Sequence, residues 1–151
     1  ALAEKVLGIC VREKVSCFLH SRIPIARKLG CTDIHLSIPY VQSMSETERE
    51  ELRRNFAQVS ISCHSMEDME LAAQAGASQI ILGTIFETDC KKGLPGRGLE
   101  FLENVCKEVD IPVYAIGGIT AEKMPQILGT GAAGGCMMSG FMQLKDHGSN
   151  R

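Results

Sequence analysis

Residues 79–98 read Gln-Ile-Ile-Leu-Gly-Thr-Ile-Phe-Glu-Thr-Asp-Cys-Lys-Lys-Gly-Leu-Pro-Gly-Arg-Gly, and this stretch decides how the chain folds. Its first four residues are typical of a buried strand, and they lead directly into a segment rich in glycine, hydroxyl and cationic side chains. Glycine lets backbone N–H groups approach anionic oxygen atoms closely, which is why phosphate sites often use it. The stretch therefore predicts a strand that delivers a loop to a charged ligand. A solvated surface loop that happens to carry Lys91 and Arg97 is the alternative.

Short units of a helix, a glycine and an apolar strand recur along the chain on both sides of this stretch. Leu29-Gly30-Cys31, Ala75-Gly76-Ala77 and Thr130-Gly131-Ala132 each end a predicted helix and precede a predicted strand. The apolar runs predict six strands, near residues 15–20, 34–37, 58–62, 79–82, 111–116 and 135–138. Helices are predicted near residues 1–11, 21–29, 45–56, 65–76, 99–108 and 120–128. The alternation indicates an α/β fold with a parallel sheet and helices outside it.

The length of the chain limits which parallel architecture it can form. Repeating units of about 20 to 25 residues suit a TIM barrel, and they also suit an open doubly wound sheet. A complete barrel needs at least about 200 residues, whereas this chain has 151. We therefore expect a single domain, residues 1–151, that is too short to be a complete barrel.

The composition excludes several classes of function. A formal net charge of −2 and the absence of tryptophan argue against a general nucleic-acid binder. No apolar run approaches the roughly 20 residues of a membrane span, and no signal peptide leads the sequence. We therefore expect a soluble, cytoplasmic protein with no nucleic-acid or membrane partner. Seven cysteines without a CxxC pair favour reduced thiols over a disulfide framework or a metal site.

Polar residues follow each predicted strand, where a parallel α/β architecture places its ligand site. These residues are His20, Ser21, Ser37, Ser62, His64, Thr84, Glu87, Thr88, Lys91, Gly117, Gly118, Ser139 and Gly140. The glycines after the last two strands, Gly117-Gly118 and Ser139-Gly140, predict a phosphate held by backbone N–H groups. Lys91 would add a point charge for phosphate or pyrophosphate. The alternative is that Gly117-Gly118 only makes a tight turn.

The histidines and methionines of the chain have less specific interpretations. His20 and His64 are either acid–base groups, which can titrate near neutral pH, or packing residues at the rim. His35 lies inside a predicted strand and is expected to be structural. Met137 and Met138 are expected to belong to the core.

Four segments of the chain resemble the thiamine phosphate synthase and TenI superfamily. They are residues 62–65, 83–93, 115–120 and 138–140, and their order and spacing agree with the family from about Ser16 to Met142. Residues 87–98 are particularly similar to TenI, the thiazole tautomerase branch. Because the family fold is a TIM (β/α)8 barrel, the resemblance implies an incomplete barrel that lacks the first two strands. A second copy of the chain or a partner chain would then complete the barrel.

The resemblance to the synthases implies roles for individual residues. Synthases join a pyrimidine pyrophosphate to a thiazole phosphate and use magnesium held partly by acidic residues. His20-Ser21 stands here in place of an Asn-Asp pair and Tyr40 in place of an aspartate, so Mg²⁺ is expected only if the chain acts as a synthase, and no other cofactor or metal ligand is assigned. The matching residues are Ser62, Thr88 and Lys91 on the pyrophosphate side, and Gly118, Met138 and Ser139 on the thiazole-phosphate side.

The resemblance to the tautomerases implies a different chemistry. Their pattern places a catalytic histidine at the position that is Thr84 here, and a threonine hydroxyl cannot replace imidazole as an acid or base near neutral pH. His64 or His20 would have to substitute for it, so His64, Thr84 and Lys91 are the candidate catalytic residues. The resemblance thus implies a protein of thiamine biosynthesis that binds a thiazole phosphate. It leaves open whether the protein is a tautomerase, a synthase or a non-catalytic regulator.

Overall fold

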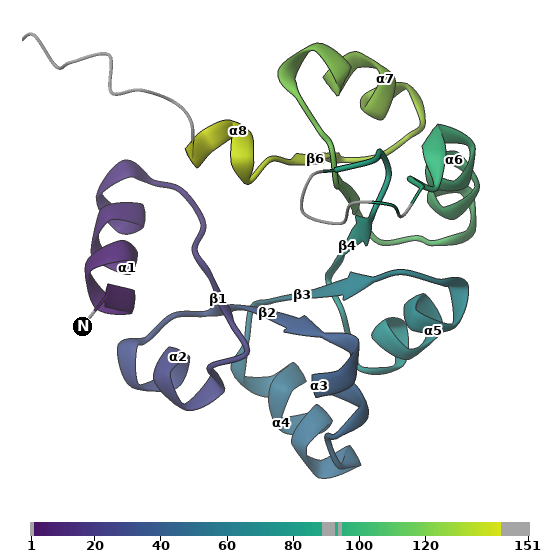
Figure 1. The fold of residues 1–151 in the computed structure, drawn as a ribbon. Coiled ribbons are helices and arrows are strands. Elements are labelled where there is room, and N and C mark those ends of the chain that lie inside the picture. Colours follow the sequence, from purple (N-terminus) through teal and green to yellow (C-terminus); the bar gives the residue numbers. More distant parts are fainter. Residues whose placement is uncertain (1, 89–92, 94, 143–151) are drawn as a thin grey trace, which may run out of the picture.

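The computed structural model describes residues 2–88, 93 and 95–142. Six strands alternate with helices along the chain (Figure 1). The strands are β1 (Phe18–His20), β2 (Asp33–Ser37), β3 (Gln58–Cys63), β4 (Gln79–Gly83), β5 (Val113–Ile116) and β6 (Gly134–Cys136). The helices are α1 (Leu2–Glu13), α2 (Ile23–Leu29), α3 (Ile38–Gln42), α4 (Glu46–Asn55), α5 (Met66–Gln74), α6 (Gly98–Glu108), the 3-10 turn η2 (Ala121–Lys123), α7 (Met124–Gly129) and α8 (Ser139–Met142).

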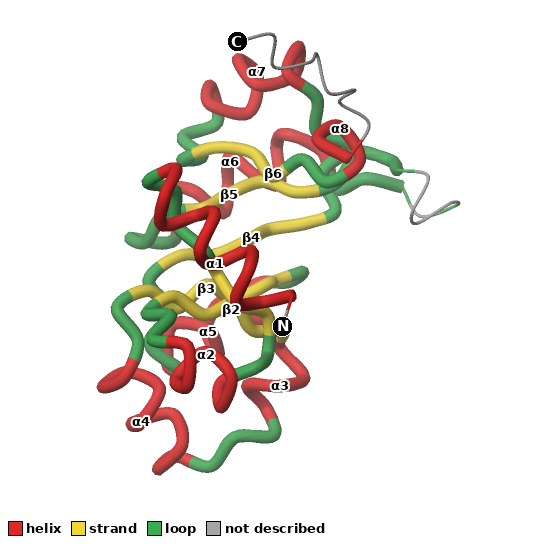
Figure 2. The backbone as a smooth tube through the Cα atoms, turned by 90° about the vertical axis from the view of Figure 1, so that its left-hand side faces the viewer, coloured by secondary structure: helices red, strands yellow, loops and turns green. Residues whose placement is uncertain are grey.

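The six strands form one parallel sheet in the order in which they occur in the chain. An open doubly wound sheet would reverse its strand order at a switch point, whereas a barrel does not. The sheet curves with the helices on its outer side, and its open side lies between α1 and α8 (Figures 1 and 2). The prediction of an incomplete TIM barrel is confirmed, because the described strands form a half-barrel.

The core lies between the sheet and its outer helices. Side chains alternate along a strand, so one set faces the helices and the next set faces the inside of the curve. In β2, Ile34 and Leu36 are fully buried on the helix side, while His35 on the other face is only half-buried. Strand β4 repeats the pattern with Ile80 and Leu82 buried. The helices therefore pack on apolar strand residues, and polar residues of β2 are left for the inner face.

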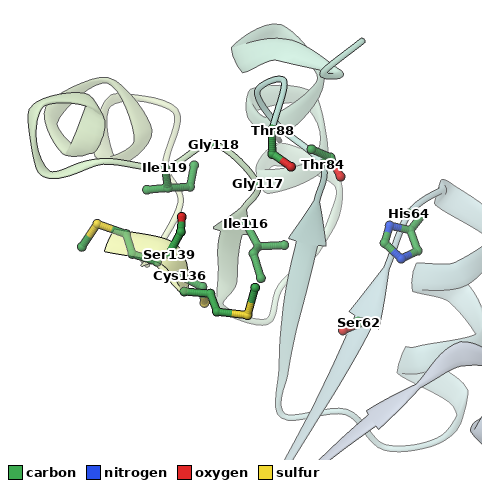
Figure 3. Close-up of a pocket in the computed structure, with 12 residues that line it drawn as sticks. Ser62, His64, Thr84, Thr88, Ile116, Gly117, Gly118, Ile119, Cys136 and Ser139 are labelled. Carbon is green, nitrogen blue, oxygen red and sulfur yellow. The ribbon is translucent and has the colours of Figure 1, made fainter. Parts of the chain in front are cut away.

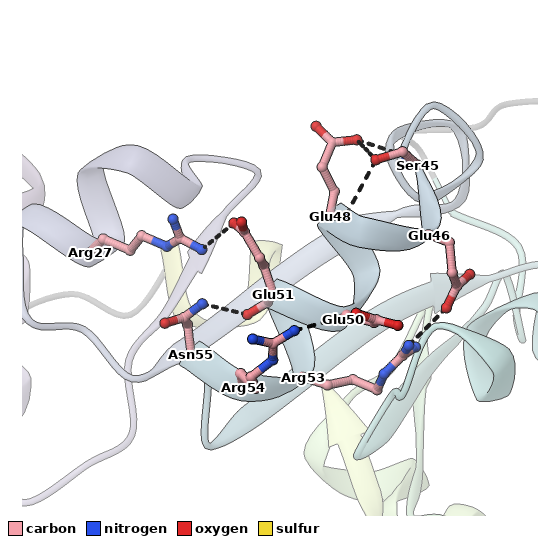
Figure 4. A network of polar contacts seen from close by, with 9 residues as sticks. All are labelled: Arg27, Ser45, Glu46, Glu48, Glu50, Glu51, Arg53, Arg54 and Asn55. Atoms are coloured by element: carbon pink, nitrogen blue, oxygen red, sulfur yellow. Dashed lines mark hydrogen bonds and ion pairs between the residues drawn. The ribbon is translucent and has the colours of Figure 1, made fainter.

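Helix α4 begins as its sequence predicts. The hydroxyl of Ser45 accepts a hydrogen bond from the backbone N–H of Glu48, and the Glu48 carboxylate accepts one from the backbone N–H of Ser45 at 2.7 Å (Figure 4). This capping box satisfies N–H groups that a helix start leaves without partners. It also lowers the pKa of Glu48, first through the backbone hydrogen bond and then through the hydroxyl of Ser45.

Several predicted boundaries were wrong at the strands. The first strand begins at Phe18 rather than residue 15, the fifth begins at Val113, beyond Pro112, and the last ends at Cys136. A proline N atom has no hydrogen to donate to a ladder, which explains the late start of β5. The short helices α3 and α8 were not predicted. Met138 follows β6 with 66% of its surface exposed, so its assignment to the core was wrong.

The N-terminal helix forms where it was predicted, but its apolar residues are not buried. Helix α1 has an apolar stripe, yet none of its residues is buried, and Leu2 and Val6 are exposed. The N-cap residue of α2 is Arg22, which makes no side-chain capping bond. Within the described part of the chain, no helix has the length and apolar character needed to cross a membrane.

Candidate functional site

A cavity of about 240 Å³ lies at the carboxyl ends of β3 to β6 (Figure 3). Its lining is Ser62, His64, Thr84, Thr88, Ile116, Gly117, Gly118, Ile119, Cys136, Met137, Met138 and Ser139. Hydroxyl groups and glycine backbone supply the polar part of this lining, and isoleucine, methionine and cysteine supply the apolar part. Such a mixture suits a small ligand with an apolar ring and a charged group.

The cavity brings together most of the residues that the sequence singled out. Its lining includes the predicted residues Ser62, His64, Thr84, Thr88, Gly117, Gly118, Met138 and Ser139, and it does not include His20, Ser21, Ser37, Glu87 or Gly140. Gly140 is an exposed residue of α8 and is not part of the lining. Lys91 lies outside the described residues. Met138 contributes an apolar surface to the cavity, which agrees with its partial exposure.

The two glycines after β5 are required by the backbone itself. Gly117 and Gly118 have φ angles of 102° and 62°, which residues other than glycine rarely adopt. A Cβ atom at Gly118 would lie 2.6 Å from the carbonyl oxygen of Glu87, and one at Gly117 would lie 3.0 Å from the Cα atom of Thr84. The two glycines therefore form a tight turn, and because both also line the cavity, the turn does not exclude a phosphate there.

The ring of His64 is oriented by the backbone of the neighbouring strand. Its Nδ1 lies 2.8 Å from the carbonyl oxygen of Gly83. A carbonyl oxygen only accepts hydrogen bonds, so Nδ1 carries the proton, and Nε2 of the neutral ring keeps its lone pair. The backbone N–H of His64 donates to Asp68 at 2.7 Å and fixes the start of the loop. The backbone thus fixes the orientation of the His64 ring at the cavity wall, which the sequence did not show.

A histidine that the sequence treated as structural makes a polar network under the cavity. His35 Nδ1 lies 2.9 Å from the hydroxyl of Ser60, and Nε2 lies 2.8 Å from the hydroxyl of Ser62. The rings of His20 and His35 stack with their centroids 5.3 Å apart. Burial, and secondly the neighbouring His20, lower the pKa of His35. His35 therefore tends to stay neutral, and it fixes the hydroxyl of Ser62, which lines the cavity.

Two features near the cavity limit its chemistry. Burial raises the pKa of Cys136, and burial together with the charge of Asp68 raises that of Cys63 to about 12, so neither thiol is a ready nucleophile near neutral pH. In the described part of the chain, no group of three or more His, Cys, Asp and Glu side chains is arranged to hold a metal ion. The described residues by themselves therefore do not fit a metal site.

Sequence reasoning missed Lys123, which follows the glycine turn. Its ammonium donates to the carbonyl oxygen of Gly118 at 2.7 Å and lies 4.3 Å from the centroid of the Phe86 ring. The contact with Phe86 could not be predicted, because Phe86 and Lys123 are far apart in the sequence. The available signal for the contact with Gly118 was a lysine five residues after the second glycine of a Gly-Gly turn.

A curved parallel sheet with its cavity at the carboxyl ends of the strands places the chain among proteins of the TIM-barrel type, which hold their ligands at that end. The chain belongs, more particularly, to the thiamine monophosphate synthase family, whose model matches residues 1–141.

Individual relatives agree with this assignment. The chain is 30% identical over 146 residues to a thiamine-phosphate synthase of Caldivirga maquilingensis, covering 95% of this chain and 68% of the relative. It is 33% identical to a putative thiamine-phosphate synthase 2 of Aquifex aeolicus, covering 94% of this chain and 74% of the relative. The solved thiamine phosphate pyrophosphorylase from Pyrococcus furiosus superposes with a TM-score of 0.80 at 26% identity, over 96% of this chain and 68% of that one.

Proposed function

We propose that the cavity binds a thiazole phosphate and that the chain takes part in the synthesis of thiamine phosphate. The observation that carries the proposal is the convergence on one cavity of the glycine turn after β5 and hydroxyl groups from the ends of β3, β4 and β6. The phosphate would rest on Gly117, Gly118 and Ser139, with Gly140 beside them. The ring would lie against Ile116, Met137 and Met138, because the apolar part of the lining comes from there.

Titration calorimetry with thiazole phosphate tests the binding proposal. Wild-type protein should bind the ligand, and Ser139→Ala should weaken binding by roughly tenfold, because a hydrogen bond to a charged phosphate is worth about 1.5 to 3 kcal/mol. Thr47→Ala is the matched control, since Thr47 is an exposed hydroxyl residue of α4. The absence of measurable heat with wild-type protein would reject the proposal, and so would equal losses in the two variants.

Synthesis of thiamine phosphate is the reaction that the relatives' names favour. Ser62, Thr88 and Lys91 would contact the pyrophosphate of the second substrate, which is released when the pyrimidine and thiazole are joined. Magnesium is the family's usual partner of pyrophosphate, but His20, Ser21 and Tyr40 stand where the family pattern has an asparagine and two aspartates. The described residues do not make a magnesium site of their own.

The turnover assay follows thiamine phosphate after mixing pyrimidine pyrophosphate and thiazole phosphate, with and without Mg²⁺. Product formed by wild-type protein and reduced at least tenfold in Ser62→Ala would support the synthase reaction. Binding of thiazole phosphate without product under both conditions would reject the synthase reaction and favour a non-catalytic ligand sensor.

A thiazole tautomerase is the second candidate, and the orientation of His64 favours it. The Nδ1–H···O=C bond to Gly83 leaves Nε2 able to accept a proton at the cavity wall. Thr84 lines the same cavity but cannot serve as the base. Exchange of a ring-bound proton of the thiazole into D₂O, followed by NMR, should then occur without magnesium and should be lost in His64→Asn. Exchange that persists in this variant would exclude His64 as the base.

A further inference from the structure

We infer that Lys123 is a positioning residue that holds the Gly118–Ile119 peptide so that its N–H group faces the bound phosphate. The inference rests on the proposed function, because it concerns the same phosphate site. It concerns a residue outside the cavity lining, in η2, whose ammonium reaches back to the glycine turn.

Three successive carbonyl groups at the end of β5 are tied to groups outside the cavity. The carbonyl oxygen of Ile116 accepts from the N–H of Ile85, and that of Gly117 accepts from the N–H of Phe86, both at 3.0 Å. The carbonyl oxygen of Gly118 accepts from the ammonium of Lys123 at 2.7 Å. The loop after β4 therefore fixes the first two peptide planes, and the side chain of Lys123 fixes the third.

The orientation of the carbonyls determines the orientation of the next N–H groups. In a planar trans peptide, the C=O of one residue and the N–H of the following residue point in opposite directions. Among the described residues, the peptide between Gly83 and Thr84 is the only one in the cis form. The N–H groups of Gly118 and Ile119 therefore point away from the N atom of Phe86 and from Lys123. Both residues line the cavity, so their N–H groups form a pair suited to an anion.

The place of the lysine ammonium is itself fixed. It lies 4.3 Å from the centroid of the Phe86 ring, a favourable distance for a cation over an aromatic face. The hydrogen bond to Gly118 polarises the peptide group, which makes its N–H a stronger donor. The positive charge behind the turn also favours an anion in front of it. Replacing Lys123 with a neutral residue removes both effects without removing any atom from the cavity wall.

The test compares two ligands that differ only in the phosphate. Thiazole phosphate and the corresponding thiazole alcohol are each titrated into wild-type protein, Lys123→Gln, Lys123→Arg and Lys107→Gln. Lys107 is the control, because it is an exposed lysine of α6 that pairs with Glu103 and its loss changes the net charge equally. Thermal melting of each variant checks that it is folded.

The expected result is a loss specific to the phosphate. Lys123→Gln should weaken the binding of thiazole phosphate about tenfold and change the affinity for the alcohol by less than about twofold. Lys123→Arg should restore most of the affinity for thiazole phosphate. Lys107→Gln should change the affinity for either ligand by no more than about twofold. Equal weakening of both ligands, or unchanged phosphate binding in Lys123→Gln, would overturn the inference. If wild-type protein binds no thiazole phosphate, the proposed function itself fails, which is a distinct outcome.

A second variant decides the question if Lys123→Gln does not fold. Phe86→Leu keeps an apolar side chain against the core and removes the aromatic face that holds the ammonium. It should weaken the binding of thiazole phosphate by about twofold to threefold relative to the binding of the alcohol. An unchanged ratio of the two affinities in folded Phe86→Leu would overturn the inference.

Discussion

Helix α4 and the glycine turn after β5 are both polar surfaces, but they are organised in opposite ways. In α4, charged partners lie within a few residues of each other or on adjacent helices: Arg54 pairs with Glu50 one turn away, and Arg27 of α2 pairs with Glu51 (Figure 4). At the turn, the carbonyl oxygen of Glu87 leaves no room for a Cβ atom at Gly118, and the ammonium of Lys123 binds the Gly118 carbonyl oxygen. The polar contacts of the helix are therefore mostly local, whereas those of the turn join segments that are distant in the sequence.

The difference has an energetic consequence. Exposed ion pairs such as those of α4 are weak, because water screens the charges and the long side chains lose rotational freedom. A backbone turn enclosed by other backbone cannot relax around an added atom in the same way. Substitutions in the two regions should therefore differ in cost by several-fold.

The largest effect is expected at Gly118. Gly118→Ala should lower the free energy of unfolding by about 3 kcal/mol, because an added Cβ meets backbone atoms and the φ angle is strained for alanine. Gly30 is the matched control, since its φ of 66° is similar and no atom lies within 4 Å of an added Cβ. Gly30→Ala should cost about 1 kcal/mol. Equal costs in urea denaturation would show that enclosure of the turn contributes nothing.

The second effect is expected at the His35 network. His35→Ala should cost about 2 kcal/mol, because it leaves the hydroxyl of the buried Ser60 without this partner. His20→Ala, which removes only the stacked ring of an exposed histidine, should cost less than about 1 kcal/mol. A larger loss for His20 than for His35 in urea denaturation would contradict the network.

The pH dependence gives an independent measure of the same network. The pKa of His35 is lowered from its ordinary value of 6.5, so the unfolded chain binds the proton more tightly than the folded chain. The stability that His35 contributes is therefore present above pH 6.5 and is lost as the pH falls through the lowered folded pKa. His35→Ala should flatten this part of the stability curve, and an unchanged curve would assign the dependence to another group.

The same contrast explains what could be predicted from the sequence. The helix that begins after Ser45 and the helix that ends at Gly30 were predicted correctly, because the Ser45–Glu48 capping box and the left-handed Gly30 depend on neighbours within a few residues. The parallel α/β sheet was predicted because the βα units repeat, and the incomplete barrel was predicted from the resemblance to the thiamine phosphate synthase and TenI superfamily. The links from His35 to Ser62 and from Lys123 to Phe86 could not be predicted, since they join segments that only the folded sheet brings together.

A moderate effect is expected at the start of α4. Ser45→Ala should cost about 1 kcal/mol, because the N–H of Glu48 loses the acceptor that caps it. Thr47→Ala, two residues further on and without a capping role, is the control and should change stability by less than about 0.5 kcal/mol. Chemical denaturation of both variants measures the difference. If Ser45→Ala lowered the free energy of unfolding as much as Gly118→Ala does, the exposed helix start and the enclosed turn would not differ in their tolerance of substitution.

The smallest effect is expected at the ion pair of Glu50 and Arg54. Their side chains are 52% and 72% exposed, and the contact of 3.3 Å spans one helical turn. Glu50→Gln should therefore change the free energy of unfolding by only about 0.3 kcal/mol, and 0.5 M NaCl should reduce that difference further by screening. A double-mutant cycle with Arg54→Gln measures the pair itself. A coupling energy above about 1 kcal/mol would mean that α4 is held by its charges, because its exposed pairs would then rival the enclosed contacts of the turn.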